Sequence, residues 1–170
     1  MKKIVLTGIA GLMLVGGFSS AGDFKPGSEP DGFRGISWGT EIGELTGLNL
    51  LRREPDHGGV DVYARTGETM VVGSAPAAAV EYFFWRGLFY RGAVLTAGAE
   101  DYQQLQQAVF AEYGVGEIDP APVPGATSFS WEGDITSMRL QYQEASRSGS
   151  LVLASQKIWL RMQQDGSDTP

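Results

Sequence analysis

A single histidine and the lack of cysteine restrict the chemistry that this chain could perform. His57 lies in the turn sequence Pro55-Asp56-His57-Gly58-Gly59, where Asp56 could orient it as a general base. No nucleophile motif accompanies His57, so an exposed loop histidine is the simpler interpretation. Without cysteine, disulfides, thiolate zinc sites and cysteine nucleophiles are excluded. One histidine also cannot build a multi-histidine metal site within one chain.

Carboxylates are the remaining candidates for catalysis. The chain has 20 Asp and Glu residues, so some pair will lie close together in any fold, and a glycosidase-type pair has little weight as a prediction. The acidic positions match no metal-binding loop, and the common nucleophile, zinc and phosphate-binding motifs do not occur. We therefore expect no catalytic residue, no metal and no cofactor.

Aromatic side chains near turns and strand ends suggest binding rather than catalysis. Such residues could form a platform for a sugar or a peptide. Four tryptophans in one small domain must mostly be buried, so packing in the core is the competing interpretation. The predicted ligand-binding residues are Trp38, Trp85, Tyr90 and Trp131.

The clearest local structure is a β-hairpin over residues 80–95. Two aromatic-rich runs flank Arg86-Gly87, and a two-residue turn that contains glycine predicts a hairpin. Direct pairing from this turn places Tyr82 opposite Arg91, although a loop one residue longer would shift the register. Both faces of the hairpin are apolar, so both need to be covered. The pairing predicts one face with Val80, Tyr82, Phe84, Phe89, Ala93 and Leu95, and another with Glu81, Phe83, Trp85, Leu88, Tyr90 and Val94.

A helix over residues 99–113 is predicted to cover one of these faces. Tyr102, Leu105 and Val109 recur at helical spacing, and Gly114 ends the pattern. Further elements are predicted as helices over 40–46 and 157–164 and as strands over 33–38, 48–53, 60–65, 127–132, 135–144 and 151–155. The expected fold class is α+β, an antiparallel sheet with two or three helices in a single domain.

The N-terminus has the three regions of a secretory signal peptide. Lys2 and Lys3 precede an uncharged run over residues 4–18, and small residues lead to a cleavage site after Ala21. The run is shorter than the roughly 20 residues that cross a membrane, although an uncleaved anchor is the alternative. We expect a signal peptide over 1–21, a flexible lead-in over 22–32, a domain over 33–164 and a disordered tail over 165–170. The mature protein would then be soluble, periplasmic or secreted, with no stable membrane insertion.

The formal net charge of −7 argues against nucleic acid as a partner. Loss of Lys2 and Lys3 with the signal peptide makes the mature chain still more acidic. Such a surface repels phosphate backbones and anionic lipid headgroups. Solubility is the simplest role of this charge.

The opening of the expected domain, PDGFRGISWGT over residues 30–40, resembles a known pattern. It is similar to the start of a family of small exported bacterial proteins of unknown function that share a GFRGI-x-WGT motif. Tyr82-x-Phe84-x-x-Gly87-x-Phe89-Tyr90, Tyr113-Gly114 and Trp131 also look like that family's pattern. The resemblance implies an exported bacterial α+β domain, and it transfers no site residue.

These observations favour a noncatalytic binding or interaction module of the bacterial envelope, with an envelope protein or glycan as its partner. The alternative is a small carboxylate-based hydrolase that acts on envelope polysaccharide or peptide, and a third hypothesis is a purely structural component. A hydrolase should have two carboxylates at catalytic separation and one raised pKa. A binding module should have an exposed aromatic or apolar patch instead.

Overall fold

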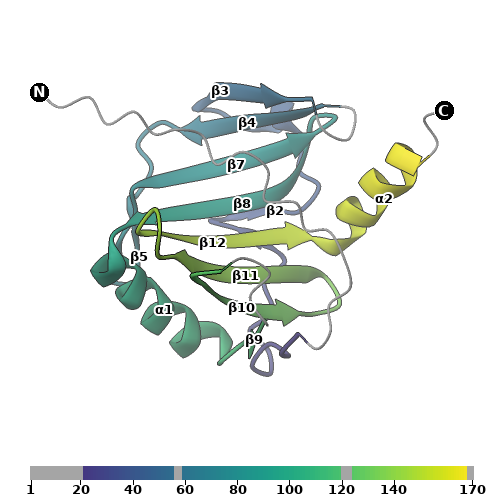
Figure 1. Cartoon of the computed structure of the whole chain (residues 1–170). Helices are drawn as coiled ribbons and strands as arrows, with labels where there is room; N and C mark the ends of the chain where they lie inside the picture. The colour runs from purple at the N-terminus through teal and green to yellow at the C-terminus, as the bar shows by residue number, and fades with distance from the viewer. Residues whose placement is uncertain (1–20, 56–58, 120–123, 168–170) are drawn as a thin grey trace, which may run out of the picture.

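The computed structural model describes residues 21–55, 59–119 and 124–167 (Figure 1). Within these residues an eight-stranded antiparallel sheet forms the centre of the fold. Its strands are, in spatial order, β3 (Leu48–Glu54), β4 (Val60–Arg65), β7 (Ala79–Trp85), β8 (Leu88–Ala97), β12 (Ser148–Ser155), β11 (Thr136–Gln143), β10 (Ala126–Glu132) and β9 (Glu117–Ile118). The predicted signal peptide lies, except for Ala21, outside the described residues.

Smaller elements connect and cover this sheet. They are the hairpins β1 (Gly32–Phe33) with β2 (Ile36–Ser37) and β5 (Val71–Val72) with β6 (Ala75–Pro76), the 3₁₀ turn η1 (Ile42–Glu44), and the helices α1 (Ala99–Tyr113) and α2 (Gln156–Ser167). Figure 1 shows α1 and α2 on opposite sides of the view, α1 at the lower left and α2 at the right. No helix among the described residues is long and apolar enough to cross a membrane.

The expected α+β class with two or three helices is wrong, because the described chain is mostly β, with two α-helices beside the large sheet. The predicted helix over 40–46 is reduced to the turn η1. Thr40, expected to cap that helix, donates its hydroxyl backwards to the carbonyl of Ser37 at 2.9 Å. Glu41 is extended and forms an isolated bridge with Leu88. The glycines at 43 and 47 disfavour a longer helix, so this segment follows the sheet instead.

The turn of the β7–β8 hairpin has the geometry that its sequence predicts. Arg86 and Gly87 have φ of 51° and 78°, so both central residues are left-handed, as in a type I′ turn. Trp85 pairs with Leu88, as expected. The same Arg-Gly pair, with φ of 50° and 79°, forms the turn of the β1–β2 hairpin at residues 34–35.

A β-bulge then changes the register of this hairpin. Phe84 pairs with Phe89 as predicted, but Phe83 pairs with Arg91, which leaves Tyr90 as the extra residue. Because side chains alternate between faces, one extra residue exchanges the faces of everything that follows. The predicted faces of Ala93 and Val94 are therefore wrong.

The sheet has a core on each face. On one face α1, β1–β2 and β5–β6 cover a large cluster that includes Tyr82, Phe84, Phe89, Val94, Tyr102, Leu105, Val109, Trp131, Leu140 and Leu153. On the other face α2 contributes to a smaller cluster of Val60, Val62, Phe83, Trp85, Tyr90, Ala93, Val152, Ile158 and Met162. We call these the α1 face and the α2 face. The helix α2 extends to Ser167, beyond the predicted end at residue 164.

The segment over 22–32, predicted to be a flexible lead-in, is docked on the sheet instead. Gly22 forms a parallel bridge with Trp131 of β10. The ring of Phe24 packs edge-on against Tyr113, with ring centroids 6.1 Å apart. The carboxylate of Glu29 accepts hydrogen bonds from the backbone N–H groups of residues 135 and 136, at 2.6 and 2.9 Å. Unpaired backbone donors and acceptors at this edge give the segment its binding partners.

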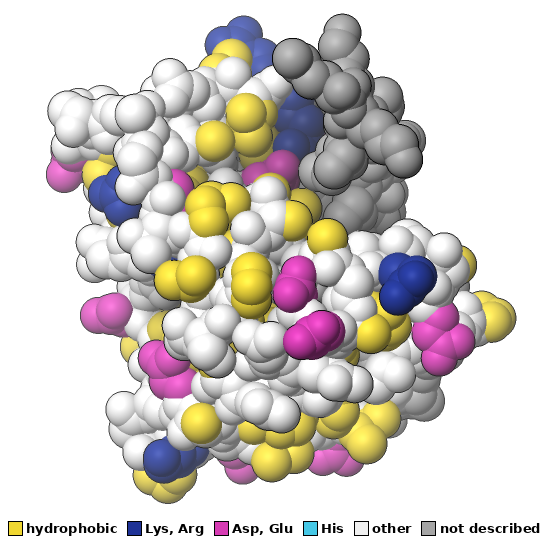
Figure 2. Space-filling model, turned by 90° about the vertical axis from the view of Figure 1, so that its left-hand side faces the viewer, with side chains coloured by type: hydrophobic (Ala, Val, Ile, Leu, Met, Phe, Trp, Pro, Cys, Tyr) yellow, Lys and Arg dark blue, Asp and Glu magenta, His cyan; other side chains and the backbone are white. Residues whose placement is uncertain are grey.

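Figure 2 shows the end of the molecule at which β5 and the start of α1 lie. Hydrophobic side chains occur there in separate groups, with acidic side chains, backbone and side chains of other types (white) between them. Met70 and Val71 are among the exposed large apolar residues of the chain. The apolar groups in this view are interrupted, so they form no continuous patch at this end of the molecule.

Candidate functional site

The four predicted aromatic residues do not form one platform. Trp85 and Tyr90 lie together in the cluster of the α2 face. Trp38 and Trp131 belong to the core of the α1 face, on the other side of the sheet. The structure therefore brings together one pair of the predicted residues and separates it from the other.

Trp38 and Trp131 have structural partners that account for them. Trp131 is fully buried, and its indole N–H donates to the carbonyl of Gly114 at 3.2 Å. Trp38 stacks on Phe89, with centroids 5.2 Å apart, and donates to the hydroxyl of Thr136 at 2.7 Å. Both indole N–H groups have acceptors within the fold, Trp131 is fully buried and Trp38 is partly buried against the core, so packing accounts for both.

On the α2 face, strand pairing aligns seven residues in one row across the sheet. Each of them lies directly opposite the next on the neighbouring strand, and directly paired residues share a face. We call this set the transverse row. From β3 to β10 it consists of Arg52, Val62, Phe83, Arg91, Ala154, Ser137 and Glu132.

Phe83 lies between two guanidinium groups of this row. The central guanidinium carbon of Arg91 is 4.2 Å from the ring centroid, and that of Arg52 is 5.8 Å away. The negative face of an aromatic ring attracts a cation, more strongly where water is excluded. Phe83 itself is buried, so the ring is a fixed support for both arginines.

The hydrogen-bond donors of Arg52 are engaged by carboxylates. Glu81 accepts two hydrogen bonds from it, at 2.8 and 2.9 Å, and Glu54 accepts a third at 2.9 Å. The hydrogen bond with Glu81 is the largest cause of a raised pKa for Arg52, and it outweighs the opposing effect of burial. The positive charge of Arg52 is thus balanced by the carboxylates of Glu81 and Glu54, and this arginine has a structural role.

Arg91 differs from Arg52 in having no such partner. Its Nε is buried without a hydrogen-bond acceptor, and no ion pair joins it to an acid in the described part of the chain. An unpartnered buried donor is costly and therefore uncommon in folded proteins. Arg91 is thus a cation held against the ring of Phe83, with a buried Nε that no acceptor among the described residues satisfies.

Sequence reasoning missed Arg91 because of the bulge at Tyr90. The predicted pairing placed Arg91 opposite Tyr82, whereas the observed register places it opposite Phe83. The only signal for Arg91 in the sequence was its position after an aromatic-rich run, and this signal does not reveal the register in which β7 and β8 pair.

Trp85 is covered by the turn and by α2. The guanidinium of Arg86 lies 4.6 Å from the indole centroid and forms an ion pair of 2.5 Å with Asp165 of α2. Ile158 and Met162, four residues apart on α2, are buried in the same cluster. Trp85 and Tyr90 are themselves buried in this cluster, so they serve as core residues under α2 and present little surface to a ligand.

Glu132 ends the transverse row on β10. Burial raises the pKa of its carboxyl, and Oε2 is buried without a hydrogen-bond partner. A raised pKa is one property that a catalytic acid needs. A carboxylate-based mechanism also needs a second carboxylate at catalytic separation, and none is identified beside Glu132 among the described residues. The raised pKa alone therefore does not define a mechanism.

The raised pKa of Glu132 predicts a pH-dependent stability. The folded state favours the protonated carboxyl, so its contribution is full below the ordinary value of 4.5 and is lost as the pH rises through the folded pKa. Glu132→Gln, which cannot ionise, should therefore raise the melting temperature at pH 7 and change it little at pH 4. Thermal unfolding at both pH values, with the exposed Glu44→Gln as the control, tests this. An equal shift at both pH values would contradict it.

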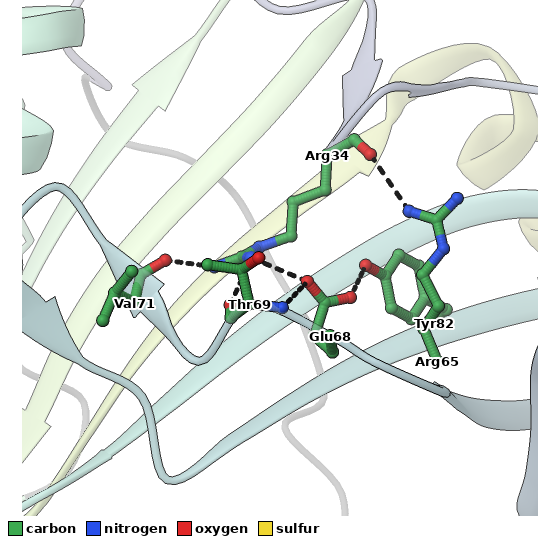
Figure 3. A network of polar contacts seen from close by, with 6 residues as sticks. All are labelled: Arg34, Arg65, Glu68, Thr69, Val71 and Tyr82. Atoms are coloured by element: carbon green, nitrogen blue, oxygen red, sulfur yellow. Dashed lines mark hydrogen bonds and ion pairs between the residues drawn. The ribbon is translucent and has the colours of Figure 1, made fainter.

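A second polar network joins the β1–β2 turn to the β5 segment (Figure 3). The carboxylate of Glu68 accepts hydrogen bonds from Arg34 at 2.8 Å, from the backbone N–H of Thr69 at 3.0 Å and from the hydroxyl of Tyr82. Arg34 also donates to the carbonyls of Thr69 and Val71, both at 2.7 Å. Burial, followed by the hydrogen bond to Glu68, raises the pKa of Tyr82. Every strong donor here has an acceptor, so the network serves as a structural clasp.

Loss of the negative charge at Glu68 should weaken this clasp. Glu68→Gln should lower the free energy of unfolding by about 2 kcal/mol, because Arg34 loses its carboxylate in a largely buried position. Tyr82→Phe should cost about 1 kcal/mol, the value of one hydrogen bond. Urea denaturation measures both, and a Glu68→Gln effect no larger than that of Glu44→Gln would show that the clasp contributes nothing.

Asp119 is the centre of a third cluster, in which its carboxylate has several partners. It accepts from the hydroxyls of Ser128 and Ser130, at 3.3 and 3.2 Å, and pairs with Arg139 at 3.1 Å. Among the described residues no group of three or more His, Cys, Asp or Glu side chains could hold a metal ion. His57, the residue considered first as a general base, lies outside the described residues.

Comparison with family models, curated proteins and solved structures finds no match for this chain. The resemblance of the opening motif to a family of exported bacterial proteins therefore stays a hypothesis.

Proposed function

We propose that this protein is an exported, noncatalytic binding module of the bacterial envelope, and that its ligand docks on the α2 face beside Arg91. The observation that carries the proposal is the state of Arg91. Its guanidinium carbon lies 4.2 Å from the ring centroid of Phe83, and its buried Nε has no hydrogen-bond acceptor among the described residues. A positioned cation without a partner is the kind of group that fixes a ligand in a binding site.

The predicted signal peptide and the acidic charge supply the context of this proposal. Removal of residues 1–21 would release a soluble domain into the periplasm or the medium, where envelope proteins and glycans are the available partners. Two of the predicted aromatic residues, Trp85 and Tyr90, lie in the cluster beside the site. Both are buried, so they support the position of the strands that hold Arg91 and do not contact a ligand themselves.

The alternative of a carboxylate-based hydrolase has one supporting observation, the raised pKa of Glu132. The two hypotheses differ in what they require of the α2 face. A hydrolase should release new sugar or peptide ends from envelope material and should lose this activity in Glu132→Gln. A binding module should retain envelope material without turnover and should depend on Arg91 instead.

Retention on immobilised envelope fractions tests the proposal. The mature chain, residues 22–170, is passed over separate protein and glycan fractions, and the bound amount is measured at increasing concentration. We expect Arg91→Gln to weaken retention about tenfold or more, since a hydrogen bond to a charged group contributes about 1.5–3 kcal/mol. Arg161→Gln makes the same change of charge at an exposed position of α2 and should bind like the parent.

Two results would overturn the proposal. One is equal retention by Arg91→Gln and the parent, with both variants folded by circular dichroism. The other is release of new ends by the parent that Glu132→Gln abolishes, which would favour the hydrolase.

A further inference from the structure

We infer that the peptide bond between Ala21 and Gly22 is cleaved before the domain folds, and that folding then closes this cleavage site. The inference rests on the signal peptide of the proposed function and adds the order of cleavage and folding. The reaction is a hydrolysis, in which the bond between the carbonyl carbon of Ala21 and the nitrogen of Gly22 breaks. Water supplies the hydroxyl group of the new carboxyl at Ala21 and a proton of the new amine at Gly22.

Gly22, the residue that follows the predicted cleavage site, is bound to β10 through both of its backbone groups. Its N–H donates to the carbonyl of Ser130 at 3.1 Å, and its carbonyl accepts from the N–H of Glu132 at 3.0 Å. These two hydrogen bonds form the parallel bridge between Gly22 and Trp131. Gly22 therefore extends the sheet at the edge of β10, as the first residue of the predicted mature chain.

The backbone at the start of β9 closes another side of Gly22. A Cβ atom at Gly22 would lie 2.7 Å from the backbone nitrogen of Glu117 and 3.2 Å from the carbonyl carbon of Gly116. At such distances a side chain fits only if the backbone shifts, and a shift forced by overpacking is costly. Gly22 is thus enclosed by the backbone of two segments, β10 and residues 116–117.

The residues that follow Gly22 keep it in place on the sheet. The backbone N–H of Lys25 donates to the carbonyl of Tyr113 at 2.8 Å. The hydroxyl of Thr136 donates to the carbonyl of Pro30 at 2.5 Å. Because contacts of this kind continue along the segment, Gly22 does not behave as a loose chain end, and its release from β10 costs free energy.

A protease needs the backbone groups that β10 engages. An enzyme that cuts a peptide bond must surround that bond, and extended peptides are commonly bound through main-chain hydrogen bonds. In the folded chain both backbone groups of Gly22 are already bonded to β10. Cleavage of a folded precursor therefore requires local opening, and its rate falls with the population of the open state. An unfolded precursor has no such requirement.

Cleavage of the full precursor, residues 1–170, by a purified signal peptidase in detergent tests this inference. The matched control is a precursor with a Gly-Ser-Gly-Ser linker inserted between Ala21 and Gly22, which keeps glycine after the cleaved bond but moves this bond away from the sheet. We expect the folded parent to be cut at least about tenfold more slowly than the folded linker precursor, because two backbone hydrogen bonds must first open. In urea that unfolds the chain and leaves the enzyme active, both should be cut at the same rate.

Gly22→Ala separates the docking of Gly22 from recognition by the enzyme. The small residues that mark the cleavage site end at Ala21 and are unchanged, whereas the added Cβ atom collides with the backbone of Glu117. The folded Gly22→Ala precursor should therefore be cut several-fold faster than the folded parent, and at the parent's rate in urea. Asp23→Ala, at the next and exposed position, should keep the parent's ratio of folded to unfolded rates. If Gly22→Ala does not fold, the linker precursor decides the question.

Equal cleavage of the folded parent and the folded linker precursor would overturn the inference. The signal peptide and the proposed function would then still stand, because the retention of envelope material by the mature chain does not depend on the order of cleavage and folding. Failure of the enzyme to cut after Ala21 even in urea would overturn the inference together with the predicted export. The intact mass of each product identifies the bond that was cut, so the two failures are distinguishable.

Discussion

Phe84→Ala is expected to lower the free energy of unfolding by about 3–5 kcal/mol, as large-to-small changes at buried aromatic positions do. The Phe84 side chain is 1% exposed. Its ring packs against Phe89 and Tyr63, with centroids 5.3 Å away in each case. Removal of the ring leaves a cavity at the centre of the α1 face, which the neighbouring strands cannot collapse to fill.

Thermal and urea unfolding of Phe84→Ala measure this cost. A loss of this size corresponds to a fall of roughly 10 °C in melting temperature for a domain of this length. Gln107→Ala, on the exposed side of α1, should change the free energy by less than about 0.5 kcal/mol. Equal melting temperatures for Phe84→Ala and the parent would mean that the core of the α1 face contributes little to stability.

Local patterns were sufficient to predict several elements of this fold. The helix α1 begins at Ala99 and ends at Tyr113, as its apolar spacing and the following glycine predicted. The turn at Arg86-Gly87 was predicted because a two-residue turn between aromatic runs is a local signal. The strands β3, β4, β10 and β11 also lie within a residue or two of their predicted bounds. In each case the information lies within about 15 consecutive residues.

Features that depend on distant residues were not predicted. The bulge at Tyr90 is set by the fit of β8 between two neighbouring strands, which a single hairpin does not reveal. The docking of residues 22–32 depends on backbone groups of β10 and of the loop that follows it, about 100 residues away. The same limit applies to the segment over 40–46, where pairing with Leu88 competes with helix formation.

The residues of the candidate site also divide into those that local sequence could indicate and those that depend on distant parts of the chain. Aromatic composition grouped Trp85 and Tyr90 with Trp38 and Trp131, but it could not show that the two pairs pack in opposite cores. Arg91 gains its role only from the register that sets it on Phe83. A prediction of the site therefore needed the pairing of β7 with β8 to within one residue.

Gly92→Ala tests the contact that fastens the β1–β2 hairpin to the sheet. Gly92 lies on β8 between Tyr82 and Leu153, and a Cβ atom at this position would lie 2.2 Å from the ring of Phe33. The ring of Phe33 therefore occupies the space that a side chain would need. We expect Gly92→Ala to lower the free energy of unfolding by about 2–3 kcal/mol, because overpacking forces the hairpin away from the sheet.

Gly43→Ala provides the matched control for this substitution. A Cβ atom at Gly43 has no neighbour within 4 Å, and its backbone is not in the left-handed region. The same chemical change should therefore be neutral or slightly stabilising there, because it reduces the freedom of the unfolded chain. A cost at Gly43 similar to that at Gly92 would show that the effect is not steric.

A double-mutant cycle with Phe33→Ala assigns the cost of Gly92→Ala to this single contact. Phe33→Ala alone should cost about 3 kcal/mol, since the ring is buried and packs on Tyr82 with centroids 5.5 Å apart. Once the ring is gone, the added methyl group enters empty space, so the double mutant should be more stable than the sum of the single mutants by about 1–2 kcal/mol. Strict additivity would contradict the contact, because two changes that share one space cannot act independently.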